Sequence, residues 1–249
     1  MKPVIALVVL AAASLAVHGA SFSTNPTADA FVSTGASGSL SGNNYGSGGA
    51  ISLSAPGLPQ GELQSVLQFN LGGAFSSFNG TFGVGQWTIE SVTLQLNAAP
   101  ANNTIFNTPA AGLFSISWMQ NDSWTEGSGT PAAPGASGIA FTSLRSTFIG
   151  AGDEGLGTFN FSGGTSGAFN YALGLTPGLT ADLVTGDNLS LRLFAADSSV
   201  SGVFNSRSFG TAANRPLLTI VAVPEPGTLA VTGLGIALLG GYRLRRGRK

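Results

Sequence analysis

The sequence predicts an all-β protein: an antiparallel β-sandwich of the jelly-roll kind with one short helix, preceded by a signal peptide and followed by one hydrophobic helix. Many short stretches alternate apolar and polar residues, which is the period of a strand with one buried face. Turn-forming segments rich in Gly, Ser and Asn separate these stretches. Glycine accounts for 37 of the 249 residues, about twice its usual share.

The clearest alternation lies in residues 65–71, 87–96, 113–119 and 189–195, which are therefore expected strands. Trp118 shares a face with other apolar residues of its stretch and is expected in the core. The other expected strands are residues 28–32, 50–54, 139–144, 158–161, 168–173, 202–207 and 216–221.

Residues 177–184 are the one expected helix. Thr176 is a suitable N-cap, Pro177 occupies the first helical position, and Gly186 follows the end. These signals mark both ends of a short helix.

Composition excludes several classes of function. Residues 21–222, the expected single domain, carry four basic and ten acidic side chains, a net charge of −6. Nucleic acid is excluded as a partner because its phosphates require a basic patch. The chain has no cysteine, and its one histidine, His18, precedes the mature domain. Catalysis by Ser-His-Asp or Cys-His, histidine-rich zinc sites and haem ligation are therefore excluded.

Residues 1–20 are typical of a signal peptide. Lys2 supplies the positive charge of the N-terminal region, and residues 4–17 are an apolar run too short to span a membrane well. Cleavage after Gly19 puts Val17 and Gly19 at the −3 and −1 positions, whereas cleavage after Ala20 puts His18 at −3. The protein is expected to be exported.

The last 27 residues, 223–249, have three parts. Residues 223–227 break helices because Pro224 and Pro226 each fix φ and lack a donor. Residues 228–242 are uncharged and predict a membrane helix of roughly 22 Å, shorter than the ~30 Å hydrocarbon core. A basic end follows, typical of a cytoplasmic stop; it contains Arg243, Arg245, Arg246, Arg248 and Lys249.

This tail resembles the PEP-CTERM sorting signal, which is also named the ice-binding protein C-terminal domain. Val223, Pro224, Glu225 and Pro226 match its motif, and the apolar helix and arginine-rich end follow as expected. The resemblance implies a Gram-negative bacterium and an exosortase that recognises the precursor in the inner membrane. It also implies transfer to the cell surface or the extracellular polysaccharide matrix. An ordinary single-span anchor stays open as the alternative.

The body resembles the DNRLRE-type extracellular β-sandwich domain, which implies surface, adhesive or polysaccharide-binding roles. Six segments follow the family's order: residues 28–32, 44–46, 65–71, 89–94, 122–127 and 214–218. The chain departs from the family in residues 97–112, which form a long stretch without charge.

Five residues are the candidate glycan-binding site. Trp124 lies between Asp122 and Glu126 at period two, so in a strand the three would share a face. An aromatic ring can stack on the C–H face of a sugar while carboxylates accept from its hydroxyls. Tyr45 and Trp87 are further stacking platforms. The alternative is a packing tryptophan flanked by two solvated acids.

No cofactor is expected except calcium, which would fix the loops of an extracellular sandwich through carboxylates and backbone carbonyls. No spacing matches an EF-hand. The candidate ligands are Asp29, Asp153, Glu154, Asp187 and Asp197.

The sequence favours an exported protein without enzymatic activity that binds polysaccharide or is a structural part of the matrix. No catalytic residue is assigned. Two alternatives stay open: a carbohydrate-active enzyme that uses carboxylates alone, and a surface adhesin that binds protein.

Overall fold

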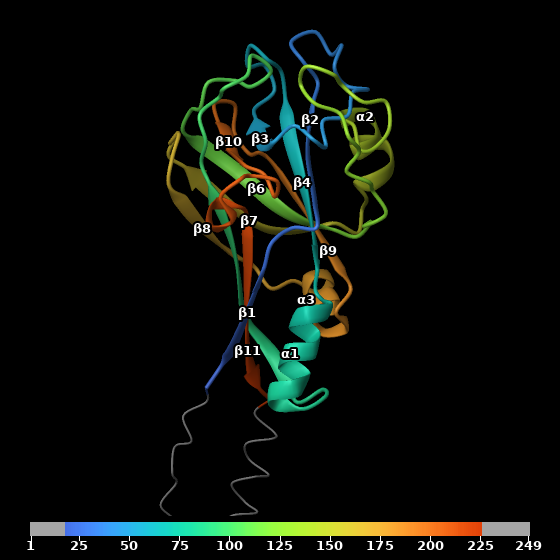
Figure 1. Ribbon diagram of the computed structural model, residues 1–249, viewed down its shortest axis with the longest axis vertical. Helices are drawn as coiled ribbons and strands as arrows, with labels where there is room; N and C mark the ends of the chain where they lie inside the picture. Colours follow the sequence, from blue (N-terminus) through green and yellow to red (C-terminus); the bar gives the residue numbers. More distant parts are fainter. Residues whose placement is uncertain (1–17, 226–249) are drawn as a thin grey trace, which may run out of the picture.

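The computed structural model describes residues 18–225 and contains two antiparallel sheets and few helices (Figure 1). It confirms the predicted all-β class. Residues 1–17, Pro226 and the apolar and basic tail lie outside the described residues. Within the described part of the chain, no helix is long and apolar enough to cross a membrane.

The smaller sheet has the strand order β1-β11-β5-β8. Its strands are β1 (Ala20–Thr24), β5 (Trp87–Asn97), β8 (Ala168–Leu173) and β11 (Leu217–Pro224). The larger sheet has the order β10-β3-β4-β9-β6-β7, with β2 also paired to β4. Its strands are β2 (Ala28–Ser33), β3 (Ala50–Ser54), β4 (Leu63–Asn70), β6 (Gly112–Met119), β7 (Glu154–Phe161), β9 (Asn188–Ala195) and β10 (Ser201–Asn205).

One hydrophobic core joins the two sheets. Leu67 and Leu191 of the larger sheet and Leu94 of the smaller one are fully buried in the same cluster. Trp118 belongs to it too, which confirms its predicted place. Each such side chain contributes roughly 1.5–3 kcal/mol by leaving water. With no disulfide in the chain, this burial is the main source of stability.

Helix α3 (Pro177–Thr185) confirms the one predicted helix, with Pro177 in the first turn and Gly186 in the left-handed conformation at the C-cap. Helix α1 (Gly72–Phe82) was not expected, because its sequence contains glycines and has no capping side chain. Its buried residues, Ala74 and Phe78, are one helical turn apart. Packing of that face thus outweighs the weak intrinsic propensity.

The predicted strand at residues 139–144 is wrong. This stretch forms α2 (Phe141–Ser143), continued by the π-helical turn η1 (Leu144–Phe148). The Ala140 N–H donates to Ser143 Oγ at 3.0 Å, which caps the first turn. The apolar residues of α2 and η1 are three and four positions apart, so they face one side of a helix. The only other helical turn among residues 18–225 is η2 (Ala212–Asn214).

The last strand continues beyond its predicted end at residue 221, because β11 runs to Pro224 beside Trp87. Ala20 at the start of β1 pairs with Ala222, so both described ends of the chain lie together, next to α1 (Figure 1). The eleven residues of β5 run from Trp87 to Asn97, so its two ends lie about 33 Å apart at the usual rise per residue.

Candidate functional site

The aromatic rings predicted to stack on a sugar are buried. Tyr45 lies flat against Phe31, with ring centroids 4.8 Å apart and planes 4° apart. Trp87 is buried beside Phe78, and its Nε1 donates to Asn79 Oδ1 at 2.8 Å. Neither ring has a free face, so the predicted stacking role does not fit their positions.

The predicted arrangement of Asp122, Trp124 and Glu126 is also wrong, because this stretch is not a strand. Trp124 is 4% exposed, and its Nε1 donates to Ser190 Oγ at 2.9 Å. The Asp122 carboxyl lies near Ser190, and burial raises its pKa. A large ring with one satisfied N–H gains more from burial than from exposure, which is why Trp124 packs inward.

Glu126 instead belongs to a partly buried ionic cluster with Asp29 and Arg207, in which only Asp29 is fully buried. The Arg207 side chain pairs with both Glu126 oxygens, and Glu126 Oε1 also accepts the Asp29 N–H at 3.0 Å. The backbone N–H of Arg207 donates to Asp29 Oδ2 at 2.6 Å. Burial, followed by repulsion from Glu126, raises the pKa of Asp29 to about 7 despite the Arg207 hydrogen bond.

The five calcium candidates do not come together. Asp29 is in the ionic cluster, Asp197 accepts backbone N–H groups from Leu113 and Val200, and Asp187 accepts from the Thr185 hydroxyl. Within residues 18–225 no group of three or more acidic or histidine side chains has the geometry to hold a metal ion.

Asp153 and Glu154 have local structural partners. Asp153 accepts from the backbone of Gln120 at 3.0 Å. Glu154 accepts the Gly178 N–H at 2.8 Å, in the first turn of α3, where the helix dipole favours a carboxylate. Both acids therefore organise loops and a helix end.

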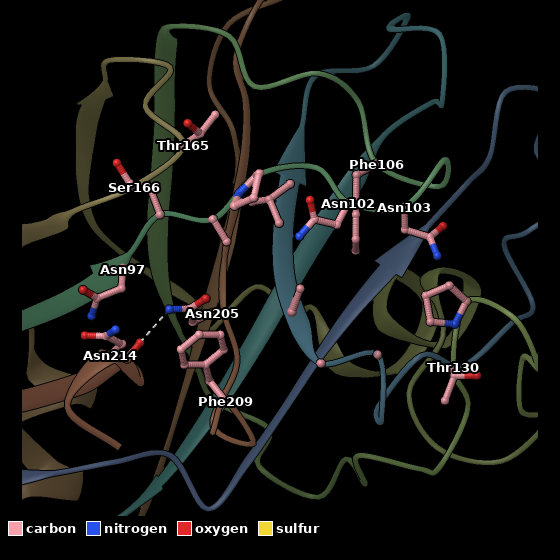
Figure 2. A pocket seen from close by; sticks show the side chains of 18 of the residues that line it. Asn97, Asn102, Asn103, Phe106, Thr130, Thr165, Ser166, Asn205, Phe209 and Asn214 are labelled. Atoms are coloured by element: carbon pink, nitrogen blue, oxygen red, sulfur yellow. Dashed lines mark hydrogen bonds between the residues drawn. The ribbon is translucent and has the colours of Figure 1, made fainter. Parts of the chain in front are cut away.

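A pocket of about 760 Å³ lies where the loops beyond β5 and β10 meet (Figure 2). This volume is within the roughly 300–1,000 Å³ range of small-ligand sites. It is lined by backbone and by small, amide and aromatic side chains, and no lining residue is charged. The polar and aromatic lining residues are Asn97, Asn102, Asn103, Phe106, Thr130, Thr165, Ser166, Asn205, Phe209 and Asn214.

The amides of the lining differ in how their hydrogen bonds are satisfied. Asn205 Nδ2 donates to the Asn214 carbonyl at 3.1 Å, shown as the dashed line in Figure 2. Asn97 is 8% exposed, and its Nδ2 has no partner among the described residues. A buried amide N–H without a partner is costly, and this atom is shielded from the pocket as well as from water, so the donors open to a ligand are those of the other lining amides.

Two phenylalanines supply the apolar part of the pocket. Phe106 is buried and packs edge-on against Phe31, with centroids 5.0 Å apart. Phe209 is 37% exposed, so a ligand could cover its ring. Its carbonyl accepts from Arg215 Nε at 2.8 Å, and Arg207 anchors the same loop to the ionic cluster. Two arginines therefore fix the backbone of the loop that carries the exposed ring.

This pocket could not be predicted from the sequence, because its residues come from five separate stretches between positions 48 and 214. The one available signal was the long uncharged segment at residues 97–112, which supplies Asn97, Asn102, Asn103 and Phe106. Amides, hydroxyls and a partly exposed ring can bind an uncharged hydroxylated molecule without chemical conversion.

No protein-family model matches the chain, and no curated protein matches it.

Proposed function

We propose that the protein is an exported, non-enzymatic jelly-roll sandwich of a Gram-negative bacterium, which binds neutral segments of extracellular polysaccharide in the pocket. An exosortase sorts it through the motif at Val223, Pro224, Glu225 and Pro226 to the surface or matrix. The uncharged, amide-rich pocket is the observation that carries the binding part of this proposal.

The lining fits a sugar for three reasons. Each sugar hydroxyl donates and accepts, and each asparagine amide does both as well. The open Phe209 ring offers an apolar face for sugar C–H groups. A pocket without charge, in a body with a net charge of −6, gives an acidic polysaccharide no compensating cation. These properties favour a neutral glycan.

The position of the pocket supports surface display. The C-terminal tail continues from Pro224, which pairs with Trp87 at the start of β5, whereas Asn97 at the far end of β5 lines the pocket. A protein held at its tail would present the pocket about 33 Å beyond the attachment end. That orientation suits capture of matrix polysaccharide.

The lack of charged residues in the pocket lining also bears on the alternative of a carbohydrate-active enzyme. A glycosidase needs two carboxyl groups flanking the scissile bond, roughly 5–9.5 Å apart. No Asp or Glu lines the pocket, so we propose binding there in place of hydrolysis. A protein-binding adhesin remains an outcome of the test.

The test is titration calorimetry of the mature protein with neutral and anionic polysaccharides, together with a glycan array. We expect saturable binding to neutral chains only, and about a tenfold loss of affinity for Phe209→Ala. Asn160→Leu, at an exposed strand position outside the pocket, is the matched control. Binding to no glycan, with loss of cell attachment in a deletion strain, would favour the adhesin.

A further inference from the structure

The sorting motif begins inside the folded sheet. Val223 pairs with Thr88 and Pro224 with Trp87 on β5. The Glu225 N–H then donates to the Gln86 carbonyl at 3.0 Å. Three of the four motif residues therefore continue the β5–β11 pairing.

The strand pairing of β11 changes after Ala222. From Leu218 to Ala222, β11 is paired on both sides, with β1 and with β5. β1 begins at Ala20, opposite Ala222, so Val223 and the residues after it pair with β5 alone. A strand end held on one side opens at lower cost than one held on two sides.

The β5 side of this end is fixed by α1. Trp87 is buried against Phe78 with ring centroids 5.2 Å apart, and its Nε1 donates to Asn79. The Gln86 N–H donates to the Gly83 carbonyl in the turn that follows α1. When this end opens, the strand that moves is therefore the last part of β11.

We propose that β5 competes with the processing protease for the backbone of Val223, Pro224 and Glu225, so that these residues must leave β5 before the chain is cut at the motif. Proteins that capture extended peptides use backbone hydrogen bonds, and β5 uses the same backbone here. Opening stops at Ala222, where β1 holds the other edge. The inference rests on the proposed function for the identity of the protease.

A disulfide lock tests this, because the chain has no native cysteine. Thr88→Cys with Val223→Cys joins a directly opposed pair at the motif. Thr93→Cys with Thr219→Cys joins an opposed pair in the part held on both sides. In cells with an oxidising periplasm, intact mass should show that the first lock retains Arg243 to Lys249, whereas the control lock is processed like wild type.

The second arm uses purified full-length protein and a proline-specific endoprotease, with cut sites identified by mass. For the first lock, cutting after Pro224 or Pro226 should be at least ~10-fold slower when oxidised than when reduced. The control lock should show no difference. Equal rates for the oxidised and reduced first lock would overturn the inference. If wild-type protein keeps its tail in cells, that result contradicts the proposed sorting and not this inference. The digestion of purified protein still measures how accessible the motif is.

Discussion

Asp29 and Arg207, 178 positions apart, are joined by a 2.6 Å hydrogen bond from the backbone N–H of Arg207 to the buried Asp29 carboxylate. Glu126 lies against both residues and forms an ion pair with the Arg207 guanidinium. The three residues connect β2, the loop after β6 and the loop after β10. Because the last of these loops carries Phe209, the cluster links a titrating group to the wall of the pocket.

Stability should fall as pH rises from about 4 to about 7. The pKa of Asp29 is raised from 3.8 to about 7 by burial, so the folded state binds this proton more tightly than the unfolded state. Between the two values the unfolded state has lost the proton and the folded state keeps it, so ionisation destabilises the fold. Asp182, with its pKa raised to about 6, adds a change of the same sign.

Urea unfolding at several pH values checks this, with Asp29→Asn as the variant. Asparagine keeps an acceptor for the Arg207 N–H but does not titrate, so the fall between pH 4 and 7 should become smaller by about 1–3 kcal/mol. Asp197→Asn is the control, because hydrogen bonds from Leu113, Ser199 and Val200 lower the pKa of Asp197. An unchanged slope in Asp29→Asn would show that Asp29 is ionised throughout this range.

Arg207→Ala should weaken both the fold and the pocket. Removing the guanidinium leaves Glu126 beside Asp29 without its cation, at a cost of about 1–2 kcal/mol because the arginine is partly exposed. It also frees the loop of Phe209, which should lower glycan affinity several-fold. Arg145→Ala, an exposed arginine over the Phe141 ring, is the control and should leave affinity unchanged.

Asn97→Leu should leave both the stability of the fold and the glycan affinity close to those of wild type. The Asn97 Nδ2 is buried without a partner, so replacing the amide with an apolar group of similar shape should leave the unfolding free energy equal or slightly higher. Affinity for a neutral glycan should stay close to that of wild type, because the Asn97 Nδ2 has no accessible surface through which it could donate to a ligand. Thermal unfolding and calorimetry on the same sample measure both. A large loss of stability would mean that Asn97 is a structural residue.

The strands could be predicted because alternation reports one buried face, as in β4 and β9. Helix α1 could not, because only tertiary packing of Ala74 and Phe78 makes its glycine-containing sequence helical. Trp87 and Trp124 were candidates for sugar stacking, with packing as the alternative for Trp124, and Trp124 does pack inward, against Ser190, a partner 66 positions away. Long-range pairs of this kind, like the five stretches that line the pocket, leave no local pattern in the sequence.

Asn44 joins the loops next to the pocket through hydrogen bonds of its side-chain amide. It is fully buried, and its Nδ2 donates to the carbonyls of Glu126 at 2.7 Å and Ile139 at 2.8 Å. Its Oδ1 accepts the N–H groups of Gly46 at 3.2 Å and Gly129 at 3.0 Å. A Cβ at Gly129 would lie 1.9 Å from the Asn44 carbonyl oxygen, so the two segments pack backbone to backbone.

Asn44→Leu should therefore cost about 3 kcal/mol or more, because four backbone groups lose one buried side-chain partner together. The loop that continues from Gly129 supplies Thr130 and Pro131 to the pocket, so glycan affinity should fall in step with stability. Asn170→Ala, at an exposed position of β8, should change neither. Chemical unfolding midpoints and calorimetry on both variants decide the matter: a stable Asn44→Leu protein with wild-type affinity would show that the loops are held without this amide.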